Sequence, residues 1–181
     1  MFDATPKLDI QVSNGSIRLH SSPNEHRISL VWQVRCQDRT LAALIRPAFS
    51  KLGHTTTVAF VVPADNRHAL SVDVDLFLPN DIECDARTSM GNIIAAQISA
   101  SCKLRTSMGR ISVSLTESWK GDQLAFSSRM GNISVKIPKA LHLALTMHTS
   151  MGSVKSNVSS YKDGAKLDIR SSMGNISLQS A

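Results

Sequence analysis

The hexapeptide Thr88-Ser89-Met90-Gly91-Asn92-Ile93 occurs, with small changes, five times in the second half of this 181-residue chain. The later copies begin at residues 106, 128, 149 and 171, and every copy keeps the Met-Gly pair. Their glycines are 18, 22, 21 and 22 residues apart, a period typical of repeat proteins. A sixth, more distant copy precedes Gly15, because residues 7–10 (KLDI) match residues 166–169 (KLDI).

The residues before each glycine alternate between apolar and polar types. Apolar residues stand seven and five positions before the glycine, and Ser or Thr stands three positions before it. This period of two predicts a strand with one buried face. After the glycine the apolar residues stand two and four positions along, so the alternation of apolar and polar residues shifts by one residue there. This shift predicts a bend at positive φ. The predicted bend glycines are Gly15, Gly91, Gly109, Gly131, Gly152 and Gly174.

Short strands with matching residues in columns favour a β-solenoid whose coils stack by parallel pairing. Leucine-rich repeats share the period, but their L-x-x-L-x-L pattern is missing from the sequence. Tandem hairpins would need tight turns in each repeat, and only Asn14-Gly15 and Asp163-Gly164 offer one. We therefore predict an all-β, right-handed parallel β-solenoid with coils of 18–22 residues, the hand following the general preference of parallel crossovers.

The repeats divide the chain into three parts of one domain, 1–181. We expect a first coil over 1–26, degenerate coils with an insertion over 27–82, and five regular repeats over 83–181. Within the middle part, residues 28–34, 55–62 and 69–78 are predicted strands, and the length leaves room for three or four coils. A short helix is predicted near 40–52, starting at Thr40 and weakened by Pro47.

The composition is that of a globular protein, with 42% hydrophobic, 19% charged and only 4% aromatic residues. The net charge of +6 permits weak attraction to polyanions. No apolar stretch is long enough for a membrane span, and the N-terminus lacks a signal-peptide layout. We therefore expect a soluble protein, either cytoplasmic or extracellular with an export segment removed.

The repeated Ser-x-Gly-x-Ile motif, together with strands that end at proline in residues 72–79 (VDVDLFLP) and 133–138 (ISVKIP), resembles a bacterial putative-adhesin domain family of unknown function. The resemblance covers nearly the whole chain and is strongest over 70–181. It implies a β-solenoid of the kind found on exported or membrane-anchored proteins, and it brings no catalytic residues with it.

The sequence gives little support to catalysis. The six histidines are scattered, and the motifs of acyl-transfer and nucleotide-binding enzymes are missing. Asp9, Asp85 and Asp168 share a column but are not expected to form a catalytic pair. We predict no enzymatic activity, no cofactor and no metal site.

Two features could carry contacts with a partner. Arg87, Arg105 and Arg170 share an outward column that could meet anions, although a solvated face is the favoured interpretation. Specific nucleic-acid binding is not expected, because no aromatic residues interleave with the basic ones. Trp119 and Tyr161 occupy equivalent turns, where they could contact a partner or, as we favour, cover a corner of the core.

Cys84 and Cys102 occupy the same column of successive repeats. Neighbouring strands bring Cα atoms within reach of a disulfide. Two reduced thiols that fill the core also fit this placement, and this is the interpretation that we favour.

The ends of a solenoid expose unpaired strand edges. Because residues 7–17 resemble residues 166–176, a second molecule could stack head to tail as the next coil. The predicted edge contacts are Leu8, Ile10, Leu167, Ile169, Ile176 and Leu178.

The sequence therefore predicts a non-enzymatic, adhesin-like scaffold that contacts proteins or surfaces. The alternatives are a filament-forming protein that stacks through its edges and a polysaccharide-binding or carbohydrate-active β-helix.

Overall fold

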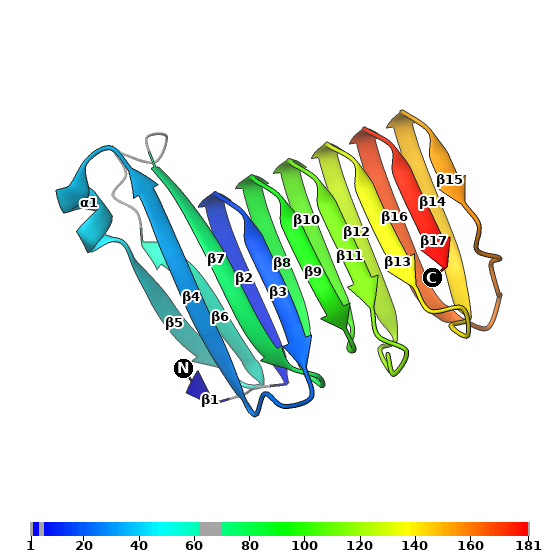
Figure 1. Cartoon of the computed structure of the whole chain (residues 1–181), viewed down its shortest axis with the longest axis horizontal. Helices are drawn as coiled ribbons and strands as arrows, with labels where there is room; N and C mark the ends of the chain where they lie inside the picture. The colour runs from blue at the N-terminus through cyan, green and yellow to red at the C-terminus, as the bar shows by residue number, and fades with distance from the viewer. Residues whose placement is uncertain (1, 4–5, 62–69, 181) are drawn as a thin grey trace.

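The computed structural model describes residues 2–3, 6–61 and 70–180, and in this part of the chain it is all-β with one short helix (Figure 1). Two large sheets of mostly parallel strands lie face to face. The eight-stranded sheet runs, in spatial order, β14 (Leu143–Met151), β16 (Ala165–Met173), β12 (Gln123–Met130), β10 (Cys102–Met108), β8 (Glu83–Met90), β2 (Lys7–Asn14), β6 (Thr55–Val61) and β5 (Arg46–Leu52). The nine-stranded sheet runs β1 (Phe2–Asp3), β4 (Arg27–Cys36), β7 (Leu70–Pro79), β3 (Ile17–Ser22), β9 (Ile93–Ile98), β11 (Ile111–Leu115), β13 (Ile133–Ile137), β17 (Ile176–Ser180) and β15 (Val154–Ser156).

Each sequence repeat forms one unit: a strand of the eight-stranded sheet, a bend at the glycine, and a strand of the nine-stranded sheet. Units pair in register, so that Leu104 lies opposite Ala86 on one side and Phe126 on the other. The apolar residues of both sheets meet between them, and Leu104, Phe126 and Ile133 are at most 1% exposed. Burial of this shared core holds the two layers together.

At the glycine bends that the structure describes, the backbones of neighbouring units come into close contact. Gly131 has φ +154°, and a Cβ built on it would lie 1.9 Å from the carbonyl oxygen of Gly109. The same approach recurs at Gly91, Gly109, Gly152 and Gly174, where the corresponding distance is 1.9–2.2 Å and φ is +150° to +158°. A Cβ on Gly15, with φ +127°, would instead meet the carbonyl oxygen of Val72 in β7 at 2.0 Å. Glycine is required here by the backbone conformation and by the place that the neighbouring carbonyl occupies.

Hydroxyl groups connect the same bends. The side chain three residues before a glycine donates a hydrogen bond to the glycine carbonyl of the next unit, as Thr106 Oγ1 does to Gly91 O at 3.0 Å. The equivalent donors are Thr88, Ser128, Ser171 and Thr149. In the five regular repeats this column holds only Ser and Thr, because a short hydroxyl satisfies a carbonyl that the bend takes out of the regular ladder; in the first unit Val12 occupies the position.

The spatial order of the units differs from their order in the sequence. The first unit, β2–β3, lies between β6–β7 and β8–β9, and the last unit, β16–β17, lies between β12–β13 and β14–β15. The alternative of head-to-tail stacking between residues 7–17 and 166–176 therefore receives no support, since each of these segments is already paired on both sides. All six predicted edge residues are buried at 0–1% exposure: Leu8, Ile10, Leu167, Ile169, Ile176 and Leu178.

Residues 27–82 contribute one parallel unit, β6–β7, rather than three or four coils. Two antiparallel strands flank it, because β4 pairs with β7 and β5 pairs with β6. The helix α1 spans Arg39–Leu44 and not 40–52, since the chain re-enters a sheet at Arg46 with Pro47 in β5. Its N-cap is Asp38, which accepts a hydrogen bond from the Thr40 backbone at 2.8 Å. Parts of the predicted strands 55–62 and 69–78 lie outside the described residues.

Cys84 and Cys102 are partners in adjacent strands, and both are free, buried thiols. Desolvation by burial raises the pKa of Cys84 well above its ordinary value, with further contributions from Cys102, Asp85 and Asp9. Desolvation, followed by the charge of Asp85, raises the pKa of Cys102 to about 12. The thiols therefore fill the core as apolar side chains.

The bend glycines predict one mutational contrast. Gly131→Ala should lower the free energy of unfolding by about 2–5 kcal/mol, because the new Cβ meets backbone and adopts an unfavourable φ. Gly53→Ala should cost only about 1–2 kcal/mol, since Gly53 has φ +58° but no atom within 4 Å of the added Cβ. Chemical denaturation of both variants measures the difference, and equal losses would contradict the proposed contact.

The hydroxyl column predicts a second contrast. Ser128→Ala should destabilise the protein by about 1–2 kcal/mol, because it removes the donor to Gly109 O in a site that is 2% exposed. Ser127→Ala, the same change on the exposed side of the same strand, should stay within about 0.5 kcal/mol. A loss at Ser128 no larger than that at Ser127 would argue against the hydrogen bond.

Burial of the thiols predicts their reactivity and a pH effect. Half-buried Cys36 should react with iodoacetamide in the native protein, whereas Cys84 and Cys102 should react only after unfolding. The protonated Cys102 thiol contributes to the free energy of unfolding. This contribution should be fully present below the ordinary pKa of 9.0 and be lost as the pH rises towards about 12. Mass spectrometry of modified peptides and melting temperatures above pH 9, compared with Cys102→Ala, test both statements.

Candidate interaction surfaces

The outer face of the eight-stranded sheet carries the predicted arginine column. The register of the strands gives its spatial order as Gln11, Arg87, Arg105, Ser127, Arg170 and His148. Two of the three predicted arginines are bound to carboxylates two residues earlier in their own strands. Arg87 Nη2 lies 2.9 Å from Asp85 Oδ2, and Arg170 Nε lies 2.9 Å from Asp168 Oδ1.

Asp85 is fixed in its ionised form by this arrangement. Burial alone would raise its pKa, but the hydrogen bond and charge of Arg87, helped by Arg105 and Lys103, outweigh burial and lower the pKa. Asp85 also lies beside Asp9 in the next strand, whereas Asp168 is separated from Asp85 by two further strands. A carboxylate held ionised by an arginine is poorly suited to donate a proton, so the column does not assemble an acid–base pair.

Arg105 differs from the other two arginines because Lys103, not an aspartate, stands two residues before it. Among the described residues, neither Arg105 nor Arg129 takes part in a salt bridge. Together with Arg87, both arginines line a shallow groove of about 400 Å³ that extends from β2 across β8, β10 and β12 to β16. Four serines of the outer face share this groove, Ser89, Ser107, Ser127 and Ser172, and the hydroxyl residues Thr88, Thr106 and Ser128 also line it. Two guanidinium groups among hydroxyls are suited to bind carboxylate, sulfate or phosphate groups.

The two predicted aromatic contacts have different environments. Trp119 is only 8% exposed, and its Nε1 donates a hydrogen bond to Ala100 O at 3.0 Å. The indole therefore covers a corner of the core and is not available to a partner. Tyr161 is 43% exposed, and its ring centroid lies 4.3 Å from that of His142.

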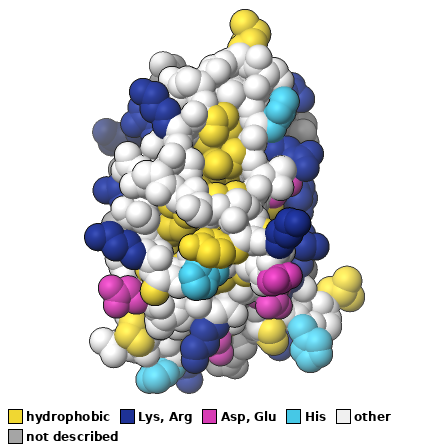
Figure 2. Space-filling model, turned by 90° about the vertical axis from the view of Figure 1, so that its right-hand side faces the viewer, with side chains coloured by type: hydrophobic (Ala, Val, Ile, Leu, Met, Phe, Trp, Pro, Cys, Tyr) yellow, Lys and Arg dark blue, Asp and Glu magenta, His cyan; other side chains and the backbone are white. Residues whose placement is uncertain are grey.

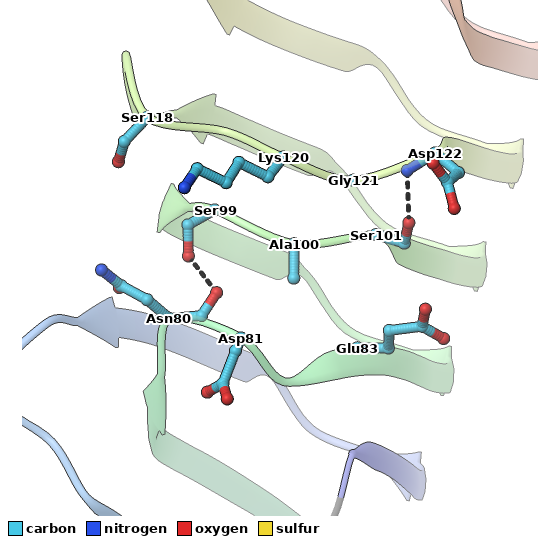
Figure 3. Close-up of a pocket in the computed structure, with 10 residues that line it drawn as sticks. All are labelled: Asn80, Asp81, Glu83, Ser99, Ala100, Ser101, Ser118, Lys120, Gly121 and Asp122. Atoms are coloured by element: carbon cyan, nitrogen blue, oxygen red, sulfur yellow. Dashed lines mark hydrogen bonds between the residues drawn. The ribbon is translucent and has the colours of Figure 1, made fainter.

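A second hollow, which the sequence did not predict, lies between the turns that follow β7, β9 and β11 (Figure 3). Asp81, Glu83 and Asp122 surround it together with Lys120. Its walls are tied by hydrogen bonds of Ser99 to Asn80 O and of Asp122 N to Ser101 Oγ. In the described part of the chain, no group of His, Cys, Asp or Glu is arranged to hold a metal ion.

One end of the stack exposes the core between β14 and β15. Figure 2 shows hydrophobic side chains in the middle of this end, with basic side chains towards both sides. The segment after β15 covers part of it, since Tyr161 N donates to Leu143 O at 2.9 Å and Leu145 N donates to Ser160 Oγ at 3.0 Å. Val154 remains 43% exposed and Met151 67% exposed.

The described residues include no helix with the length and apolar character needed to cross a membrane.

Comparison with protein-family models gives no match, and no curated protein matches the sequence. One solved structure shares the fold. A putative cell adhesion protein from Clostridium sporogenes superimposes with a TM-score of 0.68 at 13% identity, covering 97% of this chain and 92% of that chain. A putative adhesin from Bacteroides fragilis gives a TM-score of 0.38 at 11% identity, covering 99% of this chain and 93% of that chain. The chain therefore has the fold of a protein described as a putative cell adhesion protein.

Proposed function

We propose that this chain is a non-enzymatic, adhesin-like scaffold that binds anionic groups on a surface or polymer through the Arg105–Arg129 groove. The observation that carries the proposal is the different environment of the arginines on one sheet face. Arg87, which lines the same groove, and Arg170 are paired with aspartates of their own strands, whereas Arg105 and Arg129 have no salt bridge among the described residues. An anion that enters this groove gains charge-assisted hydrogen bonds without displacing a protein carboxylate.

The rigidity of the scaffold supports this role. We infer a parallel β-solenoid, because from β6 to β17 successive strands alternate between the two sheets and equivalent residues lie in register. We infer a right-handed one from the general preference of parallel crossovers. Each groove arginine stands on a strand that is paired on both sides. The spacing between the two backbone positions is therefore set by the sheet, which limits the backbone entropy lost on binding.

The alternatives receive less support. A filament built from residues 7–17 and 166–176 would need strands that the stack already encloses. A carbohydrate-active enzyme would need one carboxyl group with a raised pKa, whereas Arg87 lowers the pKa of Asp85.

The groove can be tested with serine, a residue that already occurs in both columns. Arg105→Ser/Arg129→Ser should weaken binding to immobilised heparin and polygalacturonate by about 10–30-fold, since each basic side chain near an anionic surface contributes about 1 kcal/mol. Affinities are measured at several salt concentrations, because nonspecific attraction is screened by salt.

A matched control removes the same two charges from the opposite sheet. Lys136→Ser/Lys155→Ser changes exposed residues of β13 and β15, which pair in register with Gln179 and Ser177 of β17. The control should retain most of the binding. Equal losses in both double variants would mean that net charge alone attracts the polymer, and the groove would then be rejected.

A further inference from the structure

Five methionines form a continuous column along the bends of the stack. Each directly precedes a bend glycine, and adjacent members are partners in the strand register. Their spatial order is Met90, Met108, Met130, Met173 and Met151. Asn14 occupies the next position, where its amide donates to Leu70 O, so the column ends there.

These methionine side chains are more exposed than the other residues on the same side of their strands. Thr106 and Leu104 precede Met108 by two and four residues and are at most 5% exposed. The four inner methionines are 40–42% exposed, and Met151 at the end of the stack is 67% exposed. The thioethers therefore reach solvent, while the rest of each strand builds the core.

The spacing of the column suits a metal ion held between two sulfurs. Neighbouring strands lie about 4.7–4.9 Å apart. A bond between sulfur and a d¹⁰ ion such as zinc is about 2.3 Å long, so two collinear bonds span about 4.6 Å. Thioethers are soft, neutral ligands that favour Cu(I) over hard cations, and they need no deprotonation to bind it.

The surroundings of the column favour one end of it. Arg110 follows the Met108 bend and Arg129 precedes Met130, so cationic side chains flank the middle of the column. In the sequence, Met173 and Met151 are flanked by Ser172, Asn175, Ser150 and Ser153, which carry no charge. Arg129 lies beside Ser172 in the adjacent strand, and Met151 is one strand further from it. A monovalent cation is therefore repelled least at the Met173–Met151 pair.

The backbone beneath this pair is held by a side-chain ladder. Asn175 Oδ1 accepts hydrogen bonds from Ser153 N at 2.9 Å and from Ser153 Oγ at 3.1 Å. Asn175 N in turn donates to Asn132 Oδ1 at 2.8 Å. The two bends that carry Met173 and Met151 are thus fixed relative to each other, while the flexible thioether arms can adjust around an ion.

We propose that the methionine column is a binding site for soft monovalent d¹⁰ cations, Cu(I) or Ag(I), and that the first ion binds between the thioethers of Met173 and Met151. This inference is independent of the anion-binding groove, which lies on the flat face of the sheet. Hard divalent cations are not expected to bind at the column, because none of the residues adjoining its methionines in sequence is Asp or Glu.

The test follows each methionine separately. The protein is labelled with ¹³C at the methionine methyl groups and titrated with silver nitrate in chloride-free buffer, in a Cys36→Ser background that removes the half-buried thiol. The methyl signals of Met173 and Met151 should shift first and reach saturation near one equivalent. Signals of the other three column residues should follow at higher silver concentration.

Two kinds of variant make the result specific. Met173→Leu and Met151→Leu keep the apolar side chain but remove sulfur, and each should weaken binding of the first ion at least tenfold. Met147→Leu is the matched control, since Met147 is a half-buried methionine of β14 outside the column, and it should leave the affinity unchanged.

Unchanged affinity in both column variants, or a first shift at Met147, would overturn the proposal. Shifts produced equally by Mg²⁺ would also overturn it, because they would show a response to any cation. A parallel titration with Cu(I) under reducing, oxygen-free conditions should give the same order of shifts.

Discussion

The structure depends on one close contact: the carbonyl oxygen of each bend glycine occupies the position where the next glycine would carry a Cβ. A side chain of any size would push two units apart at this point, and the separation would propagate to the paired strands on both sides of the bend. The hydroxyl of Ser or Thr then satisfies the same carbonyl from within the core. The close contact between glycine backbones and the hydrogen bond from the hydroxyl to the carbonyl together set the register of the whole stack.

The sequence alone could predict which residues lie side by side, but not which units are neighbours. The parity of residues around Gly91 and its equivalents correctly predicts strands, bends and columns. However, the columns hold the same residue types in most units, so a unit such as β16–β17 fits equally well beside β12–β13 or beside β14–β15 in terms of hydroxyl, methionine and isoleucine columns. Local patterns of this kind fix the register and leave the order of units open.

The candidate interaction surfaces could likewise be predicted only in part from the sequence. Residues two apart in a strand lie on one face, so the pairs Asp85–Arg87 and Asp168–Arg170 could have been inferred from their spacing. The same reasoning singles out Arg105, which follows Lys103. The hollow around Asp81, Glu83 and Asp122 could not be inferred in this way, because it depends on how turns of different lengths approach one another.

The enclosed position of the first and last units has a mechanical consequence. Tension transmitted to β2 and β17 would act on strands that are each held by a neighbour on either side. Pulling either strand free requires two ladders to break together, whereas a unit at the end of a sequentially ordered stack would detach by breaking one. A chain arranged in this way can bear load along its own backbone while its outer face remains attached to something else.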